Sequence, residues 1–110
     1  MDLKAICGEY FTAWSSKDLT KLAEVFDDSI HTRDWTFGVD GKEASLAANK
    51  SIFDSVTTCR AEPIELYQDG QTVACHLNIF IDDQPSFEVL DLITFSDTGK
   101  ITKLLAFRGN

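Results

Sequence analysis

The chain is organised around one stretch, Phe87-Glu88-Val89-Leu90-Asp91-Leu92-Ile93-Thr94-Phe95. Five of the eight residues other than Asp91 are β-branched or aromatic, and the turn-forming run Ser96-Asp97-Thr98-Gly99-Lys100 precedes a second apolar run. This pattern predicts a buried strand that begins a β-hairpin. A buried carboxylate is costly unless it is paired, protonated or placed in a wet pocket, so Asp91 is a candidate functional residue. A bulge or a solvated face is the alternative for Asp91.

The composition indicates one small acidic domain. The chain has 110 residues, enough for a single core, and a formal net charge of −8. Its Lys and Arg residues are not clustered, which argues against nucleic acid and anionic membrane surfaces as partners. The N-terminus has no basic region followed by an apolar run, and no apolar segment reaches membrane-spanning length, so we expect a cytoplasmic protein.

The sequence contains no pattern typical of a metal or cofactor site. Cys7, Cys59 and Cys75 are widely spaced without a Cys-x-x-Cys pair, so we expect them to be small core or surface residues. His31 and His76 lack ligand spacing, which disfavours metal-dependent hydrolysis. No glycine-rich phosphate loop is present. We therefore expect any activity to need no metal or organic cofactor and to survive a chelator.

Three helices are predicted in the first half of the chain. Helical spacing after a cap at Asp2 predicts a helix over residues 2–16, with Tyr10 on its buried face and Trp14 one turn further. On this pattern alone, Tyr10 is more often core filler than a catalytic group. Asp18 can cap a second short helix, and a third covers residues 42–56.

Strands are predicted between and after these helices. Their ranges are residues 30–37, 60–67, 72–81, 87–95 and 101–107, with residues 38–41 as a loop. Alternation places Ile30, Thr32 and Asp34 on one face of the first strand. Helices followed by an antiparallel meander predict an α+β fold with the helices on one face of the sheet.

The strand over residues 72–81 has two different faces. One face is uniformly apolar, with Val73, Cys75, Leu77, Ile79 and Ile81, and the other holds Ala74, His76, Asn78 and Phe80. If the apolar face is the core, His76 and Asn78 lie in solvent. Alternatively, the helices cover the mixed face and a second subunit buries the apolar face.

Several motifs together resemble the ketosteroid isomerase-like branch of the nuclear transport factor 2-like superfamily, which also holds the SnoaL-type polyketide cyclases. Tyr10 is followed by Asp18, and residues 19–28 match the pattern L-x-x-L-x-x-x-F-x-D. Asp34 lies at the end of the next strand, and Asp91 precedes a turn of the kind F-x-x-x-G-x-I. The resemblance covers most of the chain.

The resemblance implies a strongly curved, mixed but mainly antiparallel sheet around a cone-shaped hydrophobic pocket, closed by the three helices. With Asp91 pointing inward, the neighbouring strands are expected to contribute Ala74, His76, Asn78 and Phe80 on one side and Leu104, Ala106 and Arg108 on the other. The expected substrate-binding residues are Trp14, Phe53, Asn78, Phe87, Val89 and Arg108. The convex face is then available for a homodimer. An apolar patch of Val73, Cys75, Leu77 and Ile79 beside Leu90 and Leu92 is too large for a soluble monomer.

The same resemblance implies proton transfer next to a carbonyl group, of an isomerase or cyclase type. Asp34 is the expected base, and Tyr10 with a protonated Asp91 would donate hydrogen bonds to the developing enolate oxygen. His76 is expected to hydrogen-bond Asp91 or act as a second acid, with a polar network in the cavity as its alternative role.

Departures from the isomerases bear on the ligand. The sequence has Phe26 and Asn49 where the isomerases have tyrosines that support the catalytic tyrosine, and Trp35 replaces the proline after the base. His76, Asn78 and Arg108 would add polarity to the pocket. These differences disfavour a steroid and favour a smaller or more oxygenated carbonyl compound. A ligand-binding or dimerisation module without catalysis is the alternative function, because one fold hosts many functions.

Overall fold

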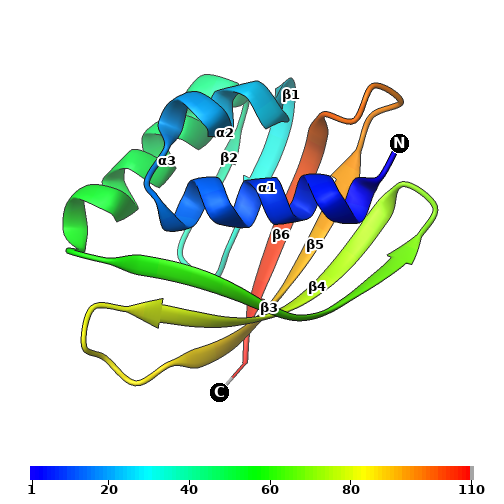
Figure 1. Ribbon diagram of the computed structural model, residues 1–110. Helices are drawn as coiled ribbons and strands as arrows, with labels where there is room; N and C mark the ends of the chain where they lie inside the picture. The colour runs from blue at the N-terminus through cyan, green and yellow to red at the C-terminus, as the bar shows by residue number, and fades with distance from the viewer. Residues whose placement is uncertain (110) are drawn as a thin grey trace.

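The computed structural model describes residues 1–109 and has three helices packed on one side of a six-stranded mixed sheet (Figure 1). The elements are α1 (Leu3–Ser15), α2 (Leu19–Val25), β1 (Phe26–Arg33), β2 (Gly38–Asp40), α3 (Lys42–Ser55), β3 (Cys59–Asp69), β4 (Thr72–Ile81), β5 (Phe87–Phe95) and β6 (Ile101–Arg108). The strand order is β2-β1-β6-β5-β4-β3. β1 and β6 run parallel, and all other neighbouring strands are antiparallel. The predicted α+β class is confirmed.

The helices α1 and α2 begin at the predicted caps. The Asp2 side chain accepts a hydrogen bond from the Ala5 backbone N–H at 3.1 Å, and Asp18 accepts one from Lys21 at 3.0 Å. Each bond satisfies a backbone donor that has no partner within its helix. α1 lies across the sheet and packs along β3, so its apolar side faces the concave side of the sheet (Figure 1).

Lys17 joins the helices to one another. It adopts a positive φ of 55° between α1 and α2, and its Nζ donates to the carbonyl oxygens of Phe53 and Val56 at 2.8 and 2.7 Å. These carbonyls lie at the C-terminal end of α3, where backbone acceptors lack helical partners and a positive charge is favourable. Lys17 therefore holds the end of α3 against the α1–α2 turn.

The strand boundaries differ from the prediction around β1 and β2. β1 begins at Phe26 rather than at residue 30, and it ends at Arg33, so Asp34 lies in a turn. The predicted loop contains β2, which pairs with β1 through Val39 and Thr32. β2 pairs with the end of β1 because the turn at residues 34–37 brings residues 38–40 alongside residues 31–33.

The core lies between the helices and the apolar face of β4. Val73, Cys75 and Leu77 are buried there, opposite Ile93, Asp91 and Val89 of β5. Directly opposed residues of antiparallel strands point to the same side, so the Asp91 side of the sheet is the Cys75 side. The predicted inward orientation of Ala74, His76, Asn78 and Phe80 is therefore wrong by one residue of register.

This register also removes the apolar patch predicted for dimerisation. Val73, Cys75, Leu77 and Ile79 belong to the core of the domain itself, whereas Leu90 and Leu92 lie on the outer face. Cys7, Cys59 and Cys75 are buried free thiols, as expected of core residues.

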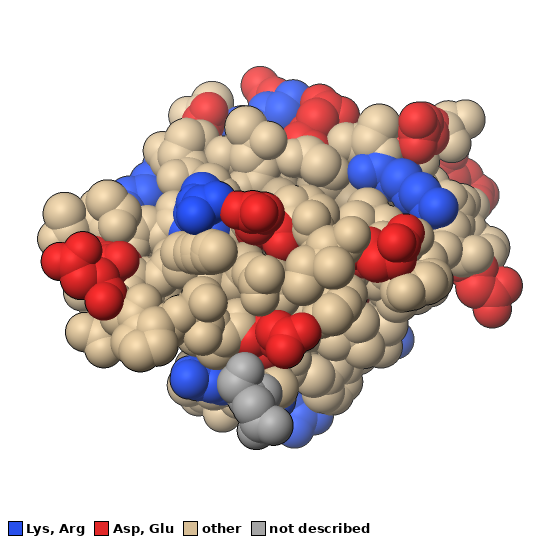
Figure 2. Space-filling view, turned by 60° about the horizontal axis from the view of Figure 1, so that its bottom comes forward, with Lys and Arg blue, Asp and Glu red and all other residues tan. Residues whose placement is uncertain are grey.

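The surface carries charges of both signs. On the face shown in Figure 2, Lys and Arg side chains are separated from one another by acidic and uncharged side chains. No helix within residues 1–109 has the length and apolar character that crossing a membrane requires.

Candidate functional site

A cavity of about 280 Å³ lies between α1, α3 and the concave side of the sheet. Its wall is mostly apolar, and its polar members are Tyr10, Thr32, Arg33, Asp34, Thr36, Asn49 and Asp91. Aromatic side chains of Trp14, Trp35, Phe37 and Phe87 surround much of the remaining space. The cavity therefore combines an apolar body with a few polar groups, which is typical of a small-molecule site.

Asp91 lies at the centre of β5 and points into this cavity. Its side chain is buried, with 6% exposure, and it lies opposite Cys75 of β4 and Ala106 of β6. Its carboxyl group forms no hydrogen bond within residues 1–109. Burial, followed by the negative charge of Asp34, raises the pKa of Asp91 from 3.8 to about 7. Asp91 can therefore stay protonated, as a hydrogen-bond donor, up to near-neutral pH.

Tyr10 projects from α1 into the same cavity. Its ring packs beside Phe11 and Phe26, with centroid distances of 5.3 and 6.2 Å. Burial raises the pKa of Tyr10 well above its ordinary value of 10.0, and the nearby negative charge of Asp91 adds to the effect. The phenol therefore keeps its proton and can donate a hydrogen bond to a ligand.

Asp34 is fixed by the turn that follows β1. Its Oδ1 accepts hydrogen bonds from the Thr36 backbone N–H at 2.7 Å, the Thr36 hydroxyl at 2.8 Å and the Phe37 backbone N–H at 3.0 Å. Within residues 1–109, its Oδ2 has no hydrogen-bond partner. The turn thus orients the carboxylate through one oxygen and leaves the other oxygen available to a ligand.

Thr32 and Asn49, with Ser45 between them, form a further polar part of the cavity wall, which was not predicted from the sequence. Thr32 on β1 shares a hydrogen bond of 2.8 Å with the Ser45 hydroxyl, and Asn49 Nδ2 donates to the Ser45 carbonyl oxygen at 2.9 Å. Thr32 and Asn49 are nearly fully buried and line the cavity. The helical spacing of Ser45, Asn49 and Ile52 was a usable signal, because it puts two polar residues on the apolar side of α3.

Trp14, Phe87 and Val89 line the cavity. Phe53 lies behind Trp14, with their rings meeting at an angle of 62° and a centroid distance of 6.1 Å. Phe53 supports the wall without lining the cavity.

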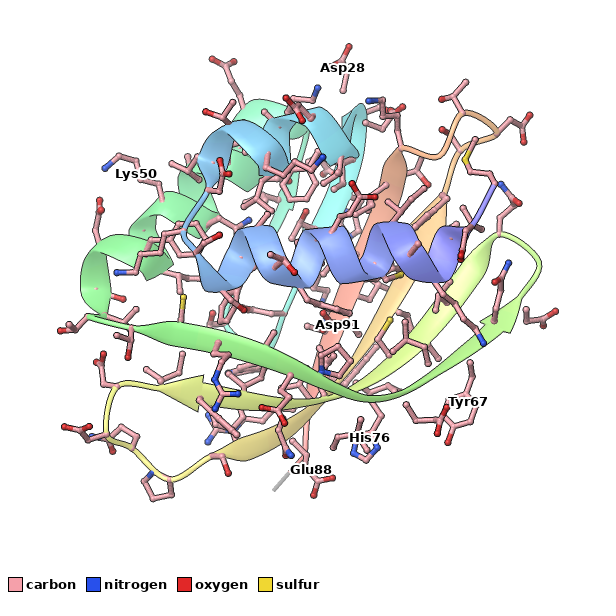
Figure 3. The ribbon with its side chains drawn as sticks, viewed as in Figure 1. Asp28, Lys50, Tyr67, His76, Glu88 and Asp91 are labelled. Carbon is pink, nitrogen blue, oxygen red and sulfur yellow. The ribbon has the colours of Figure 1, made fainter. Side chains whose placement is uncertain are left out.

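His76 and Asn78 lie outside the cavity, on the outer face of β4. His76 Nε2 lies 2.6 Å from Glu88 Oε1, and Asn78 lies opposite Glu88 in the strand register. Figure 3 shows His76 and Glu88 on the far side of the sheet from Asp91. The predicted placement of His76 and Asn78 in the pocket is therefore wrong, and Asp91 has no histidine beside it.

Residues 1–109 contain no group of three His, Cys, Asp or Glu side chains arranged to hold a metal ion. The carboxyl groups of Asp34 and Asp91 can exchange protons with a bound molecule, and their environments differ, because Asp91 is buried whereas Asp34 is partly exposed.

Comparison with known proteins relates this architecture to a described family. The model of the family described as "SnoaL-like domain" matches residues 8–104. A search of curated proteins found no match.

Several solved structures share the fold. A candidate polyketide cyclase from Sinorhizobium meliloti has 23% identity and a TM-score of 0.84, with 93% of each chain covered. A candidate ketosteroid isomerase from Kribbella flavida has 14% identity and a TM-score of 0.84, with 98% of this chain and 78% of that chain covered. An epoxide hydrolase of the LEH-like type from M. tuberculosis has 15% identity and a TM-score of 0.81, with 94% and 79% covered. These likenesses establish a shared fold.

Proposed function

The chain belongs to the SnoaL-like domain family, within the nuclear transport factor 2-like superfamily, and on this basis we propose that it is a cofactor-independent enzyme that transfers a proton next to a carbonyl group. One observation carries the proposal: Asp34, Asp91 and Tyr10, from three separate parts of the chain, line one largely apolar cavity. Similar structures named as candidate cyclases and isomerases support the same reaction class.

The three side chains divide the reaction between them. Asp34 Oδ2 removes a proton from the carbon next to the carbonyl group, and the electron pair of that C–H bond forms the enolate. Tyr10 and protonated Asp91 donate hydrogen bonds to the enolate oxygen. In an isomerase, Asp34 returns the proton to a different carbon. In a cyclase, the enolate carbon attacks a second carbonyl group of the same molecule, the π electrons of that C=O bond move to its oxygen, and this oxygen takes up the proton that Asp34 holds.

The cavity wall favours a small or oxygenated carbonyl compound over a steroid. Thr32 and Asn49 add polar contacts on the α3 side, and Trp14 occupies part of the volume. A ligand with further hydroxyl or carbonyl groups can add hydrogen bonds to these two side chains, which already bond to Ser45.

Hydrogen exchange in deuterated water tests this proposal. We expect the protein to accelerate deuterium uptake by at least one of a panel of small enones, dienols and aromatic polyketide mimics, measured by NMR. Ala106→Phe should abolish the exchange, because the larger side chain fills the cavity opposite Asp91. Ala47→Phe is the matched control, since Ala47 is exposed on α3. A parallel sample with a chelator should exchange at the same rate. Equal exchange with wild type and Ala106→Phe would contradict the proposal.

The alternative is a ligand-binding module of the same fold. The predominance of apolar side chains in the cavity wall favours this function, because such a wall binds a ligand without further chemistry. Tight binding of a compound whose protons do not exchange, across the whole panel, would favour the module.

We also propose a homodimer through the outer face, with a different set of residues from the one expected initially. The outer-face patch consists of Tyr67, Ala74, Leu90, Leu92, Leu105 and Phe107. Leu90 is 38% exposed and Phe107 is 53% exposed, and the helices cover only the opposite face. The polar side chains on this face include two hydrogen-bonded pairs, His76–Glu88 and His31–Asp40, which lie beside the apolar patch. The cytoplasmic location stays a prediction.

Light scattering at micromolar concentration should give the mass of a dimer. Leu90→Glu with Phe107→Glu should give a folded monomer, because each change places an acidic group in an apolar contact. Ala47→Glu, on the exposed side of α3, adds the same kind of charge elsewhere and should leave the dimer intact. A monomeric wild-type protein would refute this assembly.

A further inference from the structure

The inward row of β6 ends in a basic side chain at the edge of the cavity. Ala106 lines the cavity, and Arg108 follows two residues later, opposite Val89 of β5. The Arg108 guanidinium carbon lies 4.0 Å from the centroid of the Phe87 ring and 5.9 Å from that of Trp35. The two rings line the cavity and meet edge to face, with 6.0 Å between their centroids. The rings of Phe87 and Trp35, which line the cavity, therefore hold the charge of Arg108 beside it.

Of the ten Lys and Arg side chains, four form ion pairs within residues 1–109, and Arg108 is among the six that do not. Ion pairs to carboxylates are formed by Lys21, Lys42, Lys50 and Arg60. Within residues 1–109, no carboxylate oxygen forms such a pair with Arg108, although the chain has 18 acidic residues. In a protein of net charge −8, an exposed arginine that forms no ion pair is available to an anion from outside.

The stacked geometry leaves the hydrogen-bond donors of Arg108 free. A guanidinium group over an aromatic ring uses its flat face for the cation–π contact, while its five N–H donors lie around the edge in the plane. Two of these donors can bind both oxygens of a carboxylate at once. Phe87 and Trp35 therefore orient the guanidinium group without consuming its donors.

We propose that Arg108 binds a carboxylate on the substrate, so that the substrate class is small oxo acids: carbonyl compounds with a carboxylate at one end. This inference rests on the proposed function for the position of the carbonyl group, which lies at Tyr10 and Asp91, deeper in the cavity. The apolar body of the molecule lies between the two ends, against Val89 and Ala106. Arg108 is a specificity-determining residue in this arrangement.

Three probes with one aromatic core test the inference by calorimetry at neutral pH: a naphthol, the corresponding hydroxynaphthoate, and its neutral amide. The hydroxyl group of each probe imitates the enol oxygen, and only the hydroxynaphthoate carries a charge. We expect wild type to bind the hydroxynaphthoate about tenfold more tightly than the amide at low ionic strength, and the preference to shrink as salt is added.

Variants at Arg108 separate its charge from its shape. Arg108→Met should bind the naphthol as wild type does but lose the preference for the hydroxynaphthoate. Arg108→Lys should keep about a third of the preference, because an ammonium group lacks the planar pair of donors. Lys103→Met, on the outer side of the same strand, removes an equal charge and should keep the full preference. A preference that persists in Arg108→Met, or equal binding of the two probes by wild type, would overturn the inference.

Deuterium exchange distinguishes this inference from the proposed function. Exchange without any preference for the charged probe would overturn the role of Arg108 and leave the proton-transfer proposal standing. A preference that depends on Arg108, in a protein that exchanges no carbonyl compound, would support Arg108 as the anion-binding residue of a ligand-binding module. Failure of all three probes to bind would overturn the role of Arg108.

Discussion

Asp34→Asn should abolish proton exchange at the substrate carbon, with a loss of about 10³-fold or more in rate, because it removes the only proposed base. Asp91→Asn should cost less than Asp91→Ala, since an amide still donates a hydrogen bond to the enolate oxygen, whereas alanine leaves that oxygen with Tyr10 alone. We expect about 10-fold for the amide and about 10²-fold for alanine. Rates of deuterium uptake at saturating substrate give this order directly.

The chain offers a matched control for the chemical change. Asp69→Asn makes the same substitution at the exposed last residue of β3 and should leave the rate unchanged. If Asp91→Asn proves as damaging as Asp34→Asn, then Asp91 acts as a base or proton shuttle. If neither change affects an exchange activity that wild type shows, the assignment of both carboxyl groups is wrong.

The free energy of unfolding should fall as pH rises through the titration of Asp91. The pKa of Asp91 is raised from 3.8 to about 7 in the folded state, so between these values the folded protein holds a proton that the unfolded chain releases. Stability from this group is complete below pH 3.8 and is lost as pH rises through about 7. At about 1.4 kcal/mol for each pH unit, the shift corresponds to a penalty of about 4 kcal/mol in alkaline solution.

Urea unfolding of wild type and Asp91→Asn measures this penalty. The variant lacks the titrating group, so its stability relative to wild type should be about 3 kcal/mol greater at pH 8 than at pH 5. Comparing two pH values cancels the cost of burying the amide, which is the same at both. Asp34→Asn should make the loss of stability at high pH smaller, because removing the charge of Asp34 lowers the pKa of Asp91. An equal difference at both pH values would contradict the raised pKa of Asp91.

The helices and the hairpin that contains Asp91 followed from local patterns in the sequence. The caps at Asp2 and Asp18 depend on neighbours along the chain, so they could be predicted. The inward orientation of Asp91 was implied by the family resemblance, because apolar residues occur on both sides of this strand. The catalytic role of Asp91 stays a prediction, because the fold places this side chain without demonstrating a reaction.

The faces of β4 could not be predicted in the same way. Both of its faces contain apolar residues, and the pairing of Cys75 with Asp91 depends on the turn between β4 and β5. A shift of one residue exchanges the two faces, which is why His76 was assigned to the wrong side. The polar wall at Ser45 and Asn49 depends on how α3 packs against β1, a contact between segments that local spacing does not specify.

The position of β6 between β1 and β5 has a consequence for folding. β1 and β2 join the rest of the sheet only through the parallel pairing of β1 with β6, in residues about 70 positions apart along the chain. During synthesis on the ribosome, β3, β4 and β5 can pair in sequence, while β1 must wait for β6 to emerge. β6 therefore closes the sheet, and the exposed edges of β1 and β5 are most vulnerable to aggregation just before β6 emerges.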